Sequence, residues 1–278
     1  MKFKVIADSC CDFNKELRES VNIKLVPLTI HIDDKVYTDD ENLDIKELLR
    51  AMSSSEKAPQ TASPSPGDFM REYEEAENIF VVTLSSMLSS TYNHAMMAKK
   101  MVLEEFPNKF IHVFDSLSAS VGETLVSLKI LEVLKNEQDP PKIVEKVNEY
   151  INNMKTFFVL ESLENLIKAG RMSLLKGKIA SLLSIKPIMR GTEKGEISML
   201  ESVRGSKKAF KRLVEVIGEQ GEKLEDKILG IAHCNCLEKA LKFKEEVQQR
   251  YKFKDIIIVD TAGISTVYAN DGGLIIAF

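Results

Sequence analysis

The first half of the chain alternates short apolar runs with amphipathic stretches, a pattern that predicts strands followed by helices. The predicted strands cover residues 2–7, 24–32, 79–84 and 110–114, and the predicted helices cover residues 14–20, 43–52, 91–106 and 120–134. A β-α-β-α order is typical of a parallel sheet whose strands are connected by helical crossovers. We therefore expect an N-terminal α/β domain with a Rossmann-like parallel sheet.

The pattern changes near Pro140, after which one more helix leads into closely spaced apolar runs at residues 157–160, 185–189, 197–200, 228–232, 256–259 and 274–278. The second and third of these runs are separated by a short turn that contains Gly191 and Gly195. Such a connection is too short for a helical crossover and indicates a hairpin. We expect two domains, residues 1–153 with the α/β fold and residues 154–278 with an α+β fold and a mainly antiparallel sheet.

Composition and charge exclude several classes of protein. Among the 278 residues, 38 Lys and Arg oppose 42 Asp and Glu, which gives a net charge of −4. The absence of a block rich in Lys and Arg argues against nucleic-acid binding. The longest apolar runs fall far short of the ~20 residues of a membrane span, and no signal-peptide hydrophobic region opens the chain. We therefore expect a cytoplasmic protein that is not inserted in a membrane.

The four cysteines are consistent with a reducing cytoplasm. Cys10 and Cys11 are adjacent and cannot form an unstrained bridge, so we expect reduced thiols. Cys234 and Cys236 lie beside His233, a combination that can bind metal, but the spacing matches no common zinc pattern. The sequence therefore predicts no metal site.

Hydroxyl side chains gather after the predicted strands and in the loop at residues 53–67. The candidates are Ser9, Thr61, Ser63, Ser89, Thr91 and Ser116. Any single Ser or Thr ahead of a helix is explained by capping. Ligands of open parallel sheets bind at the carboxyl ends of the strands, however, and several hydroxyl clusters there predict a polar cradle for a carboxylate or a phosphate.

The same hydroxyls could instead provide a nucleophile. His94 follows Ser90 by one helical turn, and a serine needs such a base within hydrogen-bond reach. The chain has neither a G-x-S-x-G elbow nor a P-loop. A serine-dependent esterase or thioesterase that uses the 85–91 segment is therefore the alternative, and a self-sufficient kinase is not expected.

Seven segments resemble, in order, the motifs of the DegV family: residues 8–12, 61–69, 85–92, 115–116, 169–173, 185–188 and 203–204. The resemblance covers essentially the whole chain. It implies a bacterial fatty-acid-binding protein that holds a palmitate-like chain between two domains, needs no other cofactor and performs no catalysis. It also implies that a separate fatty acid kinase phosphorylates the bound carboxylate. A purely regulatory or interaction protein is a third possibility.

The resemblance also implies roles for individual residues. Thr61 and Ser89 would contact the carboxylate, and Arg171 and Arg204 would lie near the head group or the surface that docks the kinase. The family's usual C-terminal His-x-Gly-Pro-Gly is replaced here by residues 268–272, so its histidine is absent and Tyr268 is expected to supply a hydroxyl. This change bears more on phosphoryl transfer than on binding of the acyl chain. The family also usually has Gly where Ser90 and Ala169 stand.

Flexible side chains near the serine-rich segment are expected to adapt to the acyl tail. The candidates are Met87, Met96, Met97 and Met101. Methionine is unbranched and polarizable and fills irregular apolar spaces.

Overall fold

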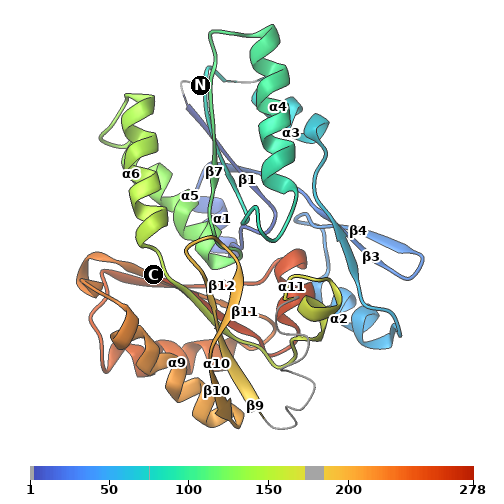
Figure 1. The fold of residues 1–278 in the computed structure, drawn as a ribbon, viewed down its shortest axis with the longest axis vertical. Coiled ribbons are helices and arrows are strands. Elements are labelled where there is room, and N and C mark those ends of the chain that lie inside the picture. The colour runs from blue at the N-terminus through green and yellow to red at the C-terminus, as the bar shows by residue number, and fades with distance from the viewer. Residues whose placement is uncertain (1–2, 75, 173–184) are drawn as a thin grey trace.

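A parallel sheet forms the first lobe of the molecule. The computed structural model describes residues 3–74, 76–172 and 185–278 (Figure 1). The strands of the first sheet lie in the order β2 (Ile23–Val26), β1 (Phe3–Asp8), β6 (Asn78–Thr83) and β7 (Phe110–Asp115), and all are parallel. Helices α3 (Pro66–Tyr73) and α4 (Thr91–Glu105) cover one face, and α5 (Val121–Leu134) and α6 (Pro140–Asn153) cover the other. The predicted α/β architecture is confirmed.

A mixed, mainly antiparallel sheet forms the second lobe. Its order is β10 (Ile197–Arg204), β9 (Ile185–Gly191), β8 (Thr156–Val159), β13 (Leu274–Ala277), β11 (Ile228–His233) and β12 (Asp255–Asp260). Only β11 and β12 run parallel, and β9 and β10 form the predicted hairpin. Helices α9 (Ser206–Gln220) and α10 (Leu237–Gln248) pack against one face of this sheet. The opposite face is turned toward the first lobe.

Four further helical elements are short. These are α1 (Lys15–Ser20), α7 (Glu164–Lys168), α11 (Gly263–Ala269) and a 3₁₀ turn at Leu224–Asp226. None of the helices described is both long and apolar enough to cross a bilayer.

The expected single strand over residues 24–32 is wrong. The chain forms β2 and then β3 (Thr29–Ile32), which joins β4 (Lys35–Thr38) and β5 (Gln60–Ala62) in a separate three-stranded sheet. Pro27 lies between the two strands, and it cannot donate a ladder hydrogen bond. Strand β5 also shows that the segment at residues 53–67 is not entirely irregular. Helix α2 (Ile45–Ser54) precedes it.

Helix α5 joins the two lobes. Its buried residues pack on the first sheet through Val126 and Ile130, and on the second through Val121 and Leu125. A Cβ at Gly230 on β11 would lie 2.4 Å from the Val121 side chain, so only glycine permits this close approach. Because α5 contacts both sheets, the division into domains 1–153 and 154–278 stays a prediction.

Candidate ligand pocket between the two sheets

A pocket lies between the carboxyl edge of the first sheet and the open face of the second. Its empty volume is about 870 Å³, including the part open to solvent. Thr156 and Phe158 on β8 and Leu160 just beyond it line the floor, because alternate residues of a strand point to the same face. Ile275 on β13 pairs with Phe158 and extends this floor.

The walls come from loops and helices of both lobes. The apolar lining includes Leu28, Leu84, Leu88, Leu117, Leu166, Ile197, Ile264 and Ala269. Side chains of this type exclude water and offer no hydrogen bond to a ligand. Most of the pocket is therefore suited to an apolar chain.

Hydroxyl and guanidinium groups gather at one end. The hydroxyl oxygens of Thr61 and Tyr268 lie 2.7 Å apart, and those of Ser89 and Thr91 lie 2.8 Å apart. Arg171 donates from Nε to the Leu88 carbonyl at 3.0 Å, and its guanidinium lies 5.9 Å from the centre of the Tyr268 ring. Thr61, Ser89, Arg171 and Tyr268 all line the pocket. The structure thus brings together four predicted site residues that span more than 200 positions of sequence.

The other predicted hydroxyls are not among the residues that line this pocket. Ser9 is buried, donates to Asp39 Oδ2 at 2.8 Å and accepts from the Leu28 amide. Ser116 is buried and donates to the Ser118 carbonyl at 3.2 Å. Ser9 and Ser116 therefore hold loops of the first sheet in place.

Ser63, Thr91 and Arg204 also lie outside the pocket lining. Ser63 forms a hydrogen bond of 2.7 Å with the Ser90 hydroxyl, and Thr91 supports Ser89 from the first turn of α4. Arg204 is exposed at the end of β10. A head-group or docking role for these three residues stays a prediction.

The methionines expected to adapt to the tail do not line the pocket either. Met87 and Met97 are more than half exposed, and Met96 and Met101 are also exposed. Helix α4 buries Ala95, Ala98 and Val102 against the sheet instead, which turns Met96, Met97 and Met101 outward, and Met87 lies in the turn before α4. The expectation is wrong, because helical phase and not proximity in sequence decides which side chains reach the pocket.

His94 is poorly placed to activate a serine. Its Nδ1 lies 2.7 Å from the Pro64 carbonyl oxygen and 3.2 Å from the Ser63 hydroxyl. Because a carbonyl only accepts hydrogen bonds, the contact with Pro64 requires the proton to be on Nδ1. A protonated Nδ1 cannot take the hydroxyl proton of Ser63. Ser85 begins the 85–91 segment that the alternative esterase would use. It is buried and donates a hydrogen bond to the Gly195 carbonyl oxygen at 2.8 Å.

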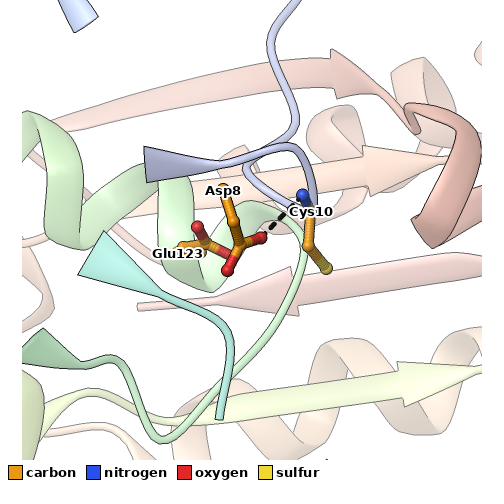
Figure 2. Close-up of side chains that lie close together, drawn as sticks. All are labelled: Asp8, Cys10 and Glu123. Carbon is orange, nitrogen blue, oxygen red and sulfur yellow. Dashed lines mark hydrogen bonds between the residues drawn. The ribbon is translucent and has the colours of Figure 1, made fainter. Parts of the chain in front are cut away.

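The buried side chains of Asp8, Cys10 and Glu123 lie close together (Figure 2), and Cys10 also lines the pocket. Asp8 accepts hydrogen bonds from the amides of Cys10 at 2.9 Å and Leu84 at 2.8 Å. Both carboxyl oxygens of Glu123 are buried and have no hydrogen-bond partner among the described residues. Burial raises the pKa of Asp8 to about 7 and the pKa of Glu123 well above its ordinary value.

Asp8, Cys10 and Glu123 are of the types that ligate metals, and their ligand atoms lie within 4.8 Å of one another. Burial also raises the pKa of the Cys10 thiol. In the protein without a ligand, burial therefore favours the protonated forms of Cys10 and Glu123. The expectation that the chain has no metal site stays a prediction.

Two further acids position the helix that carries Tyr268. Asp39 accepts from the amides of Gly263 and Ile264 at the first turn of α11, at 2.6 and 3.0 Å. Asp12 accepts from the Ala262 amide at 2.8 Å. Both acids belong to the first lobe, whereas α11 follows the last parallel strand of the second sheet. The position of Tyr268 therefore depends on contacts between distant parts of the chain.

Sequence reasoning missed the polar residues at the opposite end of the pocket. Ser118 and Thr156 share a hydrogen bond of 2.8 Å there. The run at residues 156–160 is apolar after Thr156, so the sequence does not show which of its side chains face the pocket and which pack against α9 and α10. The four cysteines are free, and Cys236 donates its amide to His233 Nδ1.

The fold and the pocket define a two-lobed α/β protein with a buried apolar cavity and a polar end. The DegV family model, described as an uncharacterised protein of that family, matches residues 2–278. The chain therefore belongs to the DegV family. A DegV domain-containing protein of Streptococcus pneumoniae strain R6 is 35% identical over 100% of this chain and 99% of its own length.

Solved structures agree with this assignment. A DegV family protein from Ruminococcus gnavus, refined with vaccenic acid, superposes with a TM-score of 0.95 at 45% identity over 99% of each chain. The Streptococcus pneumoniae Fatty Acid Kinase B3 protein, loaded with linoleic acid, superposes with a TM-score of 0.92 at 34% identity over 100% of this chain and 99% of that chain.

Proposed function

We propose that this protein binds one long-chain fatty acid, with the acyl chain between the two sheets and the carboxylate at the end formed by Thr61, Ser89, Arg171 and Tyr268. The observation that carries the proposal is the asymmetry of the pocket, whose lining is largely apolar but collects hydroxyls and a guanidinium at this end. The vaccenic and linoleic acids named for the two solved relatives support the same ligand class.

The energetics fit a fatty acid better than a short polar ligand. A chain with ~15 buried methylenes gains about 12 kcal/mol at ~0.8 kcal/mol each, before association costs of several kcal/mol. The tail therefore provides most of the affinity. A carboxylate taken out of water needs hydrogen bonds, each contributing ~1.5–3 kcal/mol, and these fix the head group at the polar end.

Tyr268 takes the place of the family's histidine. Its hydroxyl already lies 2.7 Å from the Thr61 hydroxyl, so both can turn their O–H groups toward a carboxylate. The first turn of α4 adds partial positive charge beside Ser89, because Ser90 does not cap it with its side chain. Neutral hydrogen-bond donors and the Arg171 guanidinium thus take the place of the imidazole of the family's histidine.

The first experiment asks whether the purified protein carries a lipid. Denaturing the protein and analysing the extract by mass spectrometry should release a fatty acid, and the delipidated protein should rebind palmitate or oleate. An empty pocket that also refuses both added fatty acids would contradict the proposal.

A matched pair of variants tests the head-group contact. Tyr268→Phe removes one hydroxyl donor and should weaken palmitate binding about tenfold to a hundredfold. Tyr37→Phe is the control, because the Tyr37 hydroxyl is buried, has no hydrogen-bond partner within residues 3–74, 76–172 and 185–278, and is not part of the pocket lining. Equal affinities of the two variants would show that Tyr268 does not hold the carboxylate.

We further propose that the protein acts in the cytoplasm without catalysis of its own and presents the bound carboxylate to a separate fatty acid kinase. The name of the Streptococcus pneumoniae relative, Fatty Acid Kinase B3 protein, supports this partner. Incubation of the loaded protein with a fatty acid kinase subunit and ATP should give an acyl phosphate, trapped as the hydroxamate. Fluorophosphonate should not label Ser85, Ser86, Ser89 or Ser90, whereas labelling would favour the serine-dependent esterase.

A further inference from the structure

Four residues, which we call the partition, lie between the pocket and an outer cleft at the end opposite the head group. Leu117, Thr156, Gly191 and Glu196 line the pocket, and the same four residues also line an outer cleft on the far side. A terminal methyl group that reaches this point meets the last layer of protein before the outer cleft.

The direction of the pocket follows from β8. Leu160 lies at the head-group end, because it packs in one hydrophobic cluster with Ala269 and Tyr268 of α11. Thr156 lies four residues earlier on the same face, at the partition. At ~3.3 Å per residue the floor between Leu160 and Thr156 is about 13 Å long. The tail therefore runs along β8 toward Thr156.

Contacts between the lobes hold the partition in place. The Ser118 and Thr156 hydroxyls lie 2.8 Å apart, and Ser85 donates to the Gly195 carbonyl at 2.8 Å. Gly195 has φ +80°, and a Cβ there would lie 2.2 Å from Ser85 Oγ. Only glycine therefore lets the tip of the β9–β10 hairpin close over the loops of the first sheet.

Position 191, unlike position 195, has room for a side-chain methyl group. A Cβ at Gly191 would lie 3.6 Å from Thr156 Cβ and 3.8 Å from the Leu117 carbonyl oxygen, which are ordinary van der Waals distances. The protein therefore has room for a methyl group at position 191, between two residues of the partition. The added methyl would occupy the space that the end of the tail needs.

We propose that this partition sets the longest acyl chain that the protein accepts, and that the missing side chain at Gly191 leaves room for the terminal carbons. The inference rests on the proposed fatty-acid binding and adds the residues that select chain length. Thr156 lies beside Gly191 on the neighbouring strand and adds a methyl group to the partition, so removing this methyl group lengthens the pocket.

The experiment measures affinities of the delipidated protein for saturated fatty acids of about 12 to 20 carbons by competition with a fluorescent fatty acid. Affinity should rise about fourfold per added methylene until the chain reaches the partition. Gly191→Ala should move this limit about one to two carbons shorter. Thr156→Ser keeps the hydroxyl that bonds Ser118 and should move the limit to longer chains.

Gly67→Ala is the matched control. Its added Cβ would lie 3.7 Å from Ser65 Oγ, a contact of the same kind, and Gly67 does not line the pocket. The control should leave the length limit unchanged. Gly191→Ala and Thr156→Ser variants that keep the wild-type limit, or lose affinity equally for every chain length, would overturn the inference while fatty-acid binding stands. Failure of the wild-type protein to bind any of the fatty acids would overturn the proposed function itself.

Discussion

Glu123→Gln should change how the stability of the protein depends on pH. Glu123 is fully buried, and burial raises the pKa of its carboxyl well above the ordinary value, helped by the nearby charges of Asp8 and Asp12. The folded protein therefore holds a proton on Glu123 that the unfolded chain releases above its ordinary pKa of about 4.5. Stability is greatest at low pH for this group and falls as the pH rises toward the folded pKa.

The slope of this loss is about 1.4 kcal/mol per pH unit for one group. As the pH rises from 5.5, Glu123 in the wild-type protein should therefore lower the free energy of unfolding by up to about 1.4 kcal/mol for each pH unit, until the pH reaches the folded pKa. Glutamine has nearly the same shape and no titrating proton, so the variant should lack this contribution. Asp8, whose pKa is raised to about 7, adds a slope of the same sign in both proteins.

Urea unfolding of the delipidated protein, followed by circular dichroism at pH 5.5, 6.5 and 7.5, measures the difference. Glu105→Gln at the exposed end of α4 is the control and should follow the wild-type pH dependence. Free energies of unfolding that run parallel for wild type and Glu123→Gln would refute the reasoning, because they would show that Glu123 has the same protonation in both states.

Three further outcomes follow from other parts of the structure. Gly122→Ala should destabilise the protein by ~1–3 kcal/mol in urea titrations, because the new Cβ would lie 2.1 Å from the Ser118 hydroxyl oxygen. Asp39→Asn removes one acceptor at the start of α11 and should cost ~1–3 kcal/mol of stability, together with a measurable loss of palmitate affinity, since α11 carries Tyr268. Phe80→Ala in the core of the first sheet should cost ~3–5 kcal/mol in the same titration without moving the chain-length limit, and a moved limit would argue against the partition.

The periodicity of the sequence was sufficient for most of the fold. Apolar runs and turn residues located the strands of both large sheets, and the short connection through Gly191 and Gly195 identified the β9–β10 hairpin. The end of β2 before Pro27 was not predicted, because the residues of β2 and β3 together form one stretch rich in β-branched side chains. Which sheet each half joins depends on partners distant in sequence.

The hydroxyls of the site could also be identified from the sequence. Which of them line the pocket, and which form hydrogen bonds inside the first lobe, could not. Thr61 and Ser89 line the pocket whereas Ser9 and Ser116 bond inside the first lobe, and all four belong to segments rich in hydroxyls. The pairing of Thr61 with Tyr268 joins residues 207 positions apart. No local pattern specifies such a contact.

Local physical chemistry thus determined the elements of this protein, because hydrophobic period and turn propensity act over a few residues. Only the tertiary structure decided the pocket, since its floor comes from the second lobe, whereas its head-group end and its partition each combine residues from both lobes. Burial within that arrangement also raises the pKa of Glu123 and leaves the methionines of α4 exposed. Burial depends on what packs against a residue and cannot be derived from the residue alone.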